Sequence, residues 1–196
     1  MNFLNIYIFL KAIKFKLLKF KKKYNNLYQY YRFNKSNGSI GEDVNFGMNL
    51  KISGYNNITI GDNVQIGSGC FIRGEGKLVI EDNVIISRNV IIYTNSHNYE
   101  GKYLPFDDIS VCSPVYIKKN SWIGMDVTIS PGTVINEGAI IGLGTRVYGN
   151  VPALSIVGTS KLNIIKKRNK NHYNKLEEKK SYCKENGKQY IKNDKK

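Results

Sequence analysis

The stretch ITIGDNVQIGSGCFIRGEGKLVIEDNVIISRNVII, residues 58–92, decides the fold through the spacing of its isoleucines. They recur in steps of six, with one step of eight between two runs, at Ile60, Ile66, Ile72, Ile80, Ile86 and Ile92. A period of six fits neither the helical repeat of about 3.6 residues nor the alternation of a single long strand. It indicates a strand of a few residues followed by a turn, repeated along the chain.

The same spacing extends in both directions from this stretch. Upstream it includes Ile40, Phe46 and Ile52, and Ile52 again lies eight residues before Ile60. Downstream, after a gap, the apolar positions resume at Ile117, Ile123, Ile129, Ile135, Ile141 and Val147. The two steps of eight lie 20 residues apart, so each of them adds two residues at the same corner of a coil.

Three such units predict a triangular coil of about 18 residues. The aliphatic residue of each unit points inward and stacks on its equivalent one coil away. Gly, Asn and Asp supply the turn conformations at the corners. Stacked coils then bury a continuous aliphatic core that no single repeat could bury alone.

The spacing breaks between Ile92 and Ile117, which are 25 residues apart. Because this is three steps of six with a remainder of seven, we expect part of the segment to leave the coil as an excursion loop near 95–114. Loops on a rigid scaffold often carry binding and catalytic residues. This loop contains His97, one of the two histidines of the chain, with Asn95, Asn98 and Tyr99 beside it.

The segment PVYIKKNSWIGMDVTISPGTVINEGAIIGLGTRVYGNVPALSIVG, residues 114–158, resembles the closing part of the hexapeptide-repeat acyltransferases. It is most similar to the branch that O-acetylates maltose, galactosides and capsular sugars. The motifs WIG at 122–124, PG at 131–132 and VP at 151–152 have the order and spacing of that branch. The resemblance covers roughly 40–168.

This resemblance implies that the β-helix is left-handed, whereas the general preference for right-handed crossovers would point the other way. The predicted class is therefore all-β: a left-handed parallel β-helix of hexapeptide repeats with short helical appendages at both ends. We expect an N-terminal arm over 1–35, the β-helix over 36–160 and a C-terminal tail over 161–196.

The family carries its catalytic histidine in the excursion loop, and His97 matches that position. A neutral imidazole can accept the proton of a sugar hydroxyl as its oxygen attacks an acetyl thioester. Direct transfer of this kind needs no serine or cysteine nucleophile. A carboxylate or a backbone carbonyl would fix the tautomer of the imidazole. Glu100, Asp107 and Asp108 are candidates among which the sequence does not choose.

Acceptor binding is assigned to the loop residues Asn95, Asn98 and Tyr99 and to Trp122. Relatives that act on free sugars carry an acceptor-binding asparagine near the position of Gly67, and this chain has none there. Either Asn95 takes that role or the acceptor differs. The resemblance places Trp122 in a wall of the cleft beside the acetyl donor, and a subunit contact is the alternative.

Acetyl-CoA is the co-substrate that the resemblance implies. The residues assigned to it are Trp122, Gly124, Met125, Gly142, Leu143, Lys161, Lys166 and Lys167. Met125 and Leu143 match places where the backbone of the family meets the pantetheine arm. Glycines would permit close approach of that arm, although plain turn geometry explains them equally. The lysines would meet the phosphates, but VGTSKLNIIKKR, 157–168, lacks the proline that is usual in the family.

Charge is concentrated at the two ends of the chain, whose net charge is +15. Residues 1–35 hold nine Lys and Arg and no acidic residue, whereas 36–160 hold eight basic and 11 acidic residues. We expect no nucleic-acid partner, because no recognition motif accompanies the charge. The arm, 1–35, is compatible with a basic amphipathic helix that lies on a membrane or on a partner. Packing on its own domain or on a neighbouring subunit is the alternative.

The three cysteines, Cys70, Cys112 and Cys183, are odd in number and follow neither a zinc-binding nor a disulfide spacing. This pattern predicts no metal site and favours reduced thiols in the cytoplasm. A peripheral position on the inner face of the membrane would also be compatible with the basic arm.

Together these features predict an acetyl-CoA-dependent O-acetyltransferase that acts on a sugar hydroxyl of a surface glycan or its precursor. The resemblance implies a homotrimer with its sites between adjacent subunits. Two alternatives remain open at this stage. One is an N-acyltransferase for an amino sugar or a nucleotide-linked amino sugar, and the other is a non-catalytic trimeric β-helix scaffold.

Overall fold

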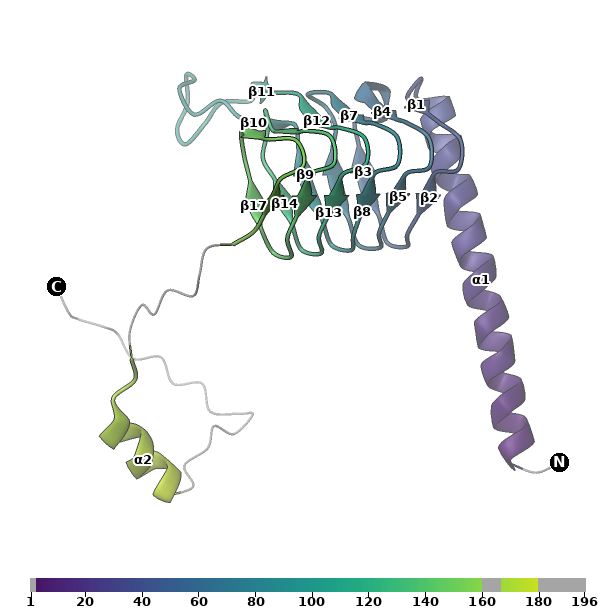
Figure 1. The fold of residues 1–196 in the computed structure, drawn as a ribbon, viewed down its shortest axis with the longest axis vertical. Helices are drawn as coiled ribbons and strands as arrows, with labels where there is room; N and C mark the ends of the chain where they lie inside the picture. The colour runs from purple at the N-terminus through teal and green to yellow at the C-terminus, as the bar shows by residue number, and fades with distance from the viewer. Residues whose placement is uncertain (1–2, 160–166, 180–196) are drawn as a thin grey trace. The chain divides into compact units, whose positions relative to one another are not determined.

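The computed structural model describes residues 3–159 and 167–179. The chain divides into two compact units, Met1–Thr159 and Ser160–Lys196. The first contains a long helix, α1 (Phe3–Lys35), followed by a stack of short parallel strands (Figure 1). The described part of the second contains α2 (Lys170–Glu178), which is capped by the side chain of Asn169. Among the described residues, no helix has the length and apolar character needed to cross a bilayer.

Most of the strands form three parallel sheets, one on each side of a coiled body. The first sheet comprises β1 (Ser39–Ile40), β4 (Ile58–Ile60), β7 (Leu78–Ile80), β12 (Val115–Ile117), β15 (Val134–Ile135) and β18 (Asn150–Val151). The second comprises β2 (Asn45–Phe46), β5 (Gln65–Ile66), β8 (Ile85–Ile86), β13 (Trp122–Ile123), β16 (Ile140–Ile141) and β19 (Ile156–Val157). The third comprises β3 (Lys51–Ser53), β6 (Phe71–Arg73), β9 (Ile91–Tyr93), β14 (Thr128–Ile129) and β17 (Arg146–Val147). The predicted left-handed parallel β-helix is confirmed.

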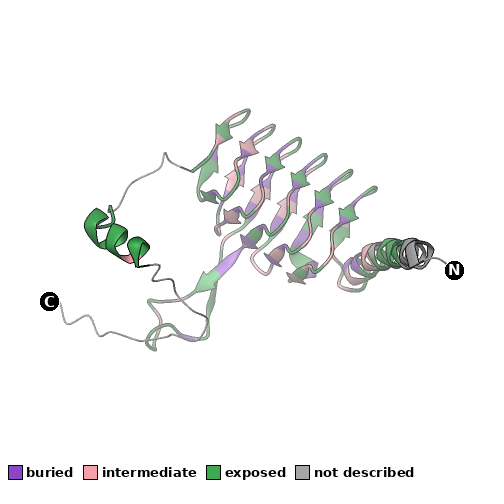
Figure 2. Cartoon of the chain, turned by 90° about the horizontal axis from the view of Figure 1, so that it is seen from below, coloured by how far each residue is buried: buried purple, intermediate pink, exposed green. Residues whose placement is uncertain are grey.

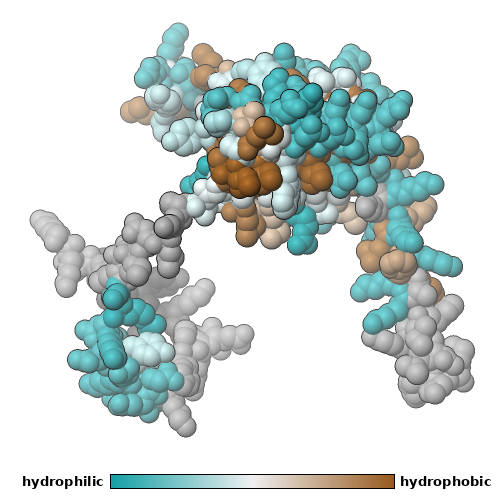
Figure 3. All heavy atoms as spheres, viewed as in Figure 1, coloured by the Kyte–Doolittle hydropathy of each residue, from teal (hydrophilic) through white to brown (hydrophobic). Residues whose placement is uncertain are grey.

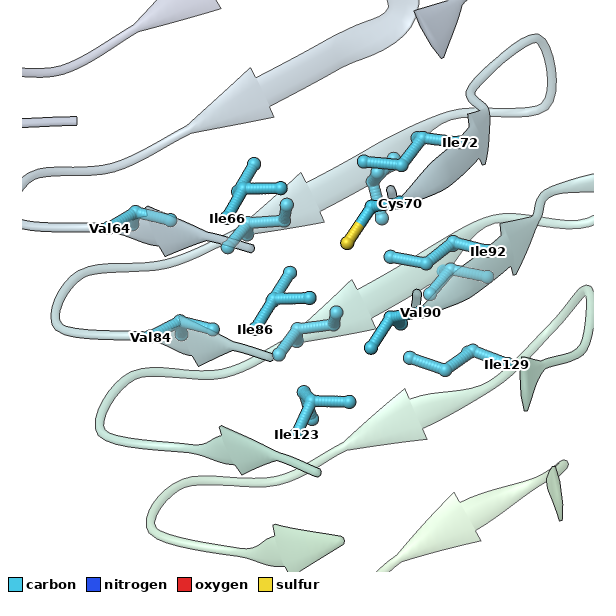
Figure 4. Close-up of a cluster of buried hydrophobic side chains, with 14 of the residues drawn as sticks. Val64, Ile66, Cys70, Ile72, Val84, Ile86, Val90, Ile92, Ile123 and Ile129 are labelled. Atoms are coloured by element: carbon cyan, nitrogen blue, oxygen red, sulfur yellow. The ribbon is translucent and has the colours of Figure 1, made fainter. Parts of the chain in front are cut away.

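The register of the strands follows from the six-residue spacing. Ile60 pairs with Ile80, and Ile80 pairs with Ile117 across the break in the repeat. The inward isoleucines stack in columns. The close-up in Figure 4 shows the columns of the other two sheets, with Ile66, Ile86 and Ile123 in one and Ile72, Ile92 and Ile129 in the other. The valines four positions after an inward isoleucine, such as Val64 and Val84, are buried as well. In Figure 2, buried residues (purple) accordingly recur along the coils of the solenoid.

The corner between the third and the first sheet varies from coil to coil, while the other two corners keep the six-residue step. It holds the two steps of eight, and at the first of them the short 3-10 helix η1 (Tyr55–Asn57) forms. The segment between Ile92 and Ile117 leaves at the same corner. At the last coil the step contracts to four, from Val147 to Val151, because Val151 pairs with Ile135. The sequence spacing ended at Val147 and did not predict this contraction.

The C-terminal third of α1 covers the open end of the solenoid at the first coil. Phe33 is fully buried and its ring packs on Phe46 and Tyr55. The side chain of Asn26 accepts a hydrogen bond from the Phe46 N–H at 2.7 Å and donates one to the Val44 carbonyl at 3.3 Å. These bonds supply partners to an edge strand that has no preceding coil. Part of α1 therefore packs on its own domain, which was one of the two alternatives for the arm.

Two cysteines lie in the described part of the chain, and neither forms a disulfide. Cys70 is buried in the core and Cys112 is exposed, whereas Cys183 lies outside the described residues. Burial raises the pKa of the Cys70 thiol above its ordinary value, so this side chain stays a neutral thiol within the core.

Candidate functional site

A two-stranded antiparallel ribbon leaves the solenoid at its variable corner (Figure 1). Its strands are β10 (Asn95–His97) and β11 (Ser110–Cys112), in which Asn95 lies opposite Cys112 and His97 lies opposite Ser110. Asn95 and His97 are two residues apart on one strand, so their side chains leave the same face of the ribbon.

The ribbon is anchored where it leaves the coil by the buried residue Thr94. Its hydroxyl donates to the Arg73 carbonyl at 2.8 Å and accepts a hydrogen bond from the Gly76 N–H at 2.7 Å. The Thr94 carbonyl accepts a hydrogen bond from the Ser113 N–H at 2.8 Å, across the base of the ribbon. His97 therefore extends only three residues beyond a fixed point of the scaffold.

The loop that joins the two strands is organised by Asp107, which is 6% exposed. One carboxylate oxygen accepts hydrogen bonds from the Asn98 side-chain amide at 3.1 Å and the Lys102 N–H at 3.3 Å. The other accepts one from the Ile109 N–H at 3.0 Å. Asp107 was one of three carboxylates considered as a partner of His97, and in the structure both of its oxygens hold the loop instead.

The imidazole of His97 stacks on the ring of Phe106, with centroids 3.9 Å apart and planes inclined by 18°. No hydrogen bond joins this imidazole to Glu100, Asp107 or Asp108 within the described residues. His97 borders a cleft of about 320 Å³ between the ribbon and the third sheet. The cleft is lined by Arg73, Tyr93, Asn95, Ser96, His97, Ser110 and the segment 128–131.

Asn95 brings an unsatisfied acceptor to this cleft. The residue is 4% exposed, and its side-chain oxygen has no hydrogen-bond partner in the described structure. A buried carbonyl without a partner costs about 1–3 kcal/mol. A ligand hydroxyl that donated to this oxygen would recover that cost.

Arg73, Tyr93 and Thr128 lie on the third sheet and are among the cleft residues that were not predicted as site residues. The Arg73 guanidinium lies 5.5 Å from the centroid of the Tyr93 ring. Each of the three adjoins an inward isoleucine and so points outward from the third sheet. Their positions next to inward isoleucines could be read from the sequence. The pairing of successive coils was needed to place the three residues on one surface.

A second surface includes Met125, one of the residues assigned to acetyl-CoA. It is a groove of about 600 Å³ beside the second sheet, lined by the successive turns at 47–48, 67–68 and 87–88 and by Met125. Trp122 is 51% exposed, and its indole N–H donates to the Ser87 hydroxyl at 3.3 Å. The Arg88 guanidinium lies 3.7 Å from the Met125 sulfur. Trp122 thus borders the groove through Ser87.

The turns that continue this groove stack by backbone hydrogen bonds. The Gly124 N–H donates to the Ile141 carbonyl at 2.8 Å, and the Gly144 N–H donates to the Met125 carbonyl at 2.8 Å. A Cβ atom at Gly124 would lie 2.7 Å from the Ile141 oxygen, so coil stacking alone demands glycine there. At Gly142 the nearest atom would be the Val157 oxygen at 3.2 Å, and Leu143 is exposed.

The remaining predicted residues lie elsewhere. Asn98 supports Asp107 in the loop, and Tyr99 is exposed within the excursion. Lys161 and Lys166 lie outside the described residues, and Lys167 begins the described part of the second unit. No group of three potential metal ligands occurs among the residues that the structure describes.

The predicted residues therefore fall into two sets on different surfaces of one chain. His97 and Asn95 share the cleft beside the third sheet, whereas Met125 and the neighbouring Trp122 belong to the groove beside the second. No residue lines both hollows. Within a single chain, the residues of each set lie close together, but the two sets lie apart from one another.

Similarity to known proteins bears on the fold and on the family. No family model matches the chain. The solved structure of a maltose O-acetyltransferase from Clostridium difficile 630 is 31% identical, with a TM-score of 0.54, over 68% of this chain and 71% of that one. A galactoside acetyltransferase solved in complex with coenzyme A is 26% identical, with a TM-score of 0.57, over 69% of this chain and 67% of that one.

A curated relative also matches part of the chain. WbbJ of Escherichia coli K12, whose name is that of a lipopolysaccharide biosynthesis O-acetyl transferase, is 39% identical over 67 residues. This match covers 34% of this chain and 33% of the relative. The chain thus spans about a third of the length of this curated relative.

Proposed function

Because the chain belongs to the family of hexapeptide-repeat acetyltransferases, we propose that it transfers an acetyl group from acetyl-CoA to a sugar hydroxyl of a surface glycan or its precursor. The names of three similar proteins support this class of acceptor, since they refer to maltose, galactoside and lipopolysaccharide. One observation carries the proposal: His97 lies at the border of a cleft, three residues from an anchored base, beside the unsatisfied oxygen of Asn95.

In this proposal His97 is the general base. The imidazole takes the proton from the acceptor hydroxyl while the hydroxyl oxygen forms a bond to the acetyl carbonyl carbon. The carbon–sulfur bond of the thioester then breaks, and the imidazole returns the proton to the departing thiolate. Stacking on Phe106 holds the ring in place, which is the positioning that such a transfer requires.

The groove beside the second sheet, which Trp122 borders, is the proposed site of the acetyl donor. Its floor is made of turns, whose backbone groups suit the amide-bearing pantetheine arm, and the turns at Gly124 and Gly142 are proposed to continue that floor. Arg88 adds a positive charge near Met125. Leu143 would make backbone contacts, and Lys161, Lys166 and Lys167 are proposed to meet the phosphates.

The acceptor is proposed to occupy the cleft beside His97. Its hydroxyl groups would donate to the side-chain oxygen of Asn95 and could accept from Arg73, which also lines the cleft. Asn98 acts indirectly in this scheme, because it supports Asp107. Tyr99, exposed on the excursion, is proposed to contact a longer glycan.

We further propose that the site is assembled in a homotrimer. The cleft of one subunit would face the groove of its neighbour, so that His97 of one copy meets the donor held by another. The separation of the two sets in a single chain supports this arrangement. Cys70 is buried and expected to be reduced, which is compatible with the proposed cytoplasmic location of the enzyme.

The experiment that tests the proposal measures release of CoA thiol from acetyl-CoA against a panel of sugars, oligosaccharides and nucleotide sugars. Acceptor-dependent release with an alkali-labile product is the expected result, because an O-acetyl ester is cleaved by mild base. An alkali-stable product from an amino sugar would instead establish N-acylation. Failure to bind acetyl-CoA and to release thiol with every acceptor would favour the scaffold and overturn the proposal.

A further inference from the structure

The proposed reaction does not use the exposed apolar stripe of α1. Within the segment that caps the solenoid, Asn25, Asn26, Gln29, Tyr30 and Phe33 contact the first coil. Tyr24, Leu27 and Tyr31, interleaved with them, are 64%, 67% and 56% exposed. One face of the helix thus covers the core of the solenoid while the opposite face, also apolar, covers nothing within the described part of the chain.

This outward face continues along the helix. Its residues are spaced alternately by three and four positions, at Ile13, Leu17, Phe20, Tyr24, Leu27 and Tyr31, and all are exposed. At about 100° per residue, this spacing keeps them in one stripe, and at about 1.5 Å per residue the stripe is roughly 27 Å long. In Figure 3 apolar and hydrophilic side chains alternate along this part of the helix.

Lysines flank the stripe on both sides. Helical geometry places Lys14 and Lys21 along one edge and Lys16 and Lys23 along the other. All four are exposed. Long lysine side chains at the edges of an apolar face can keep that face in contact with hydrocarbon while the ammonium groups reach the lipid phosphates.

From these contacts we infer that the outward face of α1 lies flat on an anionic lipid bilayer and attaches the solenoid to it. The charge pattern favours a bilayer over a second copy of the helix as the partner of this outward face. Pairing two such stripes would oppose lysines with lysines, and 1–35 contains no acidic residue to relieve the repulsion. An anionic bilayer supplies both an apolar layer and negative charge. This inference is independent of the proposed acetyl transfer.

Flotation of the full chain with vesicles tests the inference. We expect binding to phosphatidylcholine vesicles that contain phosphatidylglycerol, weak binding to phosphatidylcholine alone, and a decrease with added salt. Phe20→Ser should weaken binding by roughly tenfold or more, because Phe20 would be buried in the bilayer. Phe15→Ser is the matched control: Phe15 is 60% exposed, against 68% for Phe20, but lies on the other side of the helix.

Both substitutions lie at exposed positions of one helix, and circular dichroism will verify that the helix remains. Equal weakening by Phe15→Ser and Phe20→Ser would overturn the inference, as would equal binding to neutral and anionic vesicles. A lipid-free oligomer that Phe20→Ser dissociates would also overturn it, because the stripe would then be an interface between copies.

Discussion

The His97 imidazole lies almost parallel to the Phe106 ring, with their centroids 3.9 Å apart. Both residues belong to the excursion, one on β10 and the other in the loop that joins β10 to β11. The ring that we propose as the general base is thus positioned by a neighbouring aromatic ring and not by a carboxylate. The following predictions concern this pair, its supports and its partners.

Removing the Phe106 ring should lower kcat without unfolding the chain. Phe106→Ala is expected to cost about ten- to a hundredfold in kcat, because the imidazole loses the surface that holds it. Phe106→Tyr keeps the ring and should restore most of the activity. Leu104→Ala, at a 96% exposed position of the same loop, is the control that should act like the native chain. Equal losses for Phe106→Ala and Leu104→Ala would contradict the positioning role.

Asp107→Asn should loosen the loop while leaving the solenoid intact. An amide NH₂ would replace one carboxylate oxygen, and the N–H donors of the loop would lose an acceptor, at a local cost of about 1–3 kcal/mol. We expect faster proteolysis within 98–109 and lower activity, with an unchanged Tm for the body. Asp108→Asn, at the exposed neighbouring position, is the matched control. If Asp108→Asn accelerated cleavage as much as Asp107→Asn, Asp107 would not be the residue that organises the loop.

Glu81 provides a pH-dependent link across the break in the repeat. It accepts hydrogen bonds from the Lys118 ammonium at 2.8 Å and the Lys119 N–H at 3.0 Å, which join the coils before and after the excursion. Partial burial alone would raise the pKa of Glu81, but these bonds and the nearby lysine charges outweigh it, so the net pKa is lowered.

A lowered pKa means that the stabilisation is present above the ordinary glutamate pKa of about 4.3 and is lost as the pH falls through the lower folded-state value. Because both side chains are about one third exposed, the pair should contribute less than about 1 kcal/mol. Glu81→Gln and Lys118→Gln, combined in a double-mutant cycle of urea unfolding, will measure the coupling. The coupling should vanish in acid, and a coupling that grew with acidity would contradict a lowered pKa for Glu81.

A site shared between subunits predicts complementation. His97→Ala and Trp122→Ala should each be inactive or nearly so as pure proteins. In randomly mixed trimers, about one quarter of the interfaces would pair an intact His97 with an intact Trp122 from the neighbour. Co-expression should therefore restore about a quarter of the native activity. Activity no higher than that of the two pure variants would place both residues in one chain's site.

The sequence predicted the body of the fold well because one rule repeats there. Each inward residue, such as Ile60 or Ile80, has the same environment one coil away, so spacing alone determines the register. The contraction between Val147 and Val151 was not predicted, because a shortened corner leaves no apolar signal. The capping role of Phe33 was also missed, since it depends on how α1 meets the first coil.

The site was less accessible to prediction. A histidine in a loop has no periodic neighbours, and His97 was identified by resemblance to a family. Its contact with Phe106 depends on a loop conformation set by Asp107, which no spacing encodes. Arg73 and Tyr93 come from successive coils and meet only when the third sheet is assembled.

The most direct test of the proposed role of His97 compares His97→Ala with His172→Ala, the substitution of the other histidine, in acetyl-CoA-dependent thiol release with the best acceptor. We predict that His97→Ala lowers kcat by about 10²- to 10⁴-fold while acetyl-CoA binding is retained, and that His172→Ala is fully active. Native turnover in His97→Ala would contradict this role, because a group other than His97 would then accept the proton.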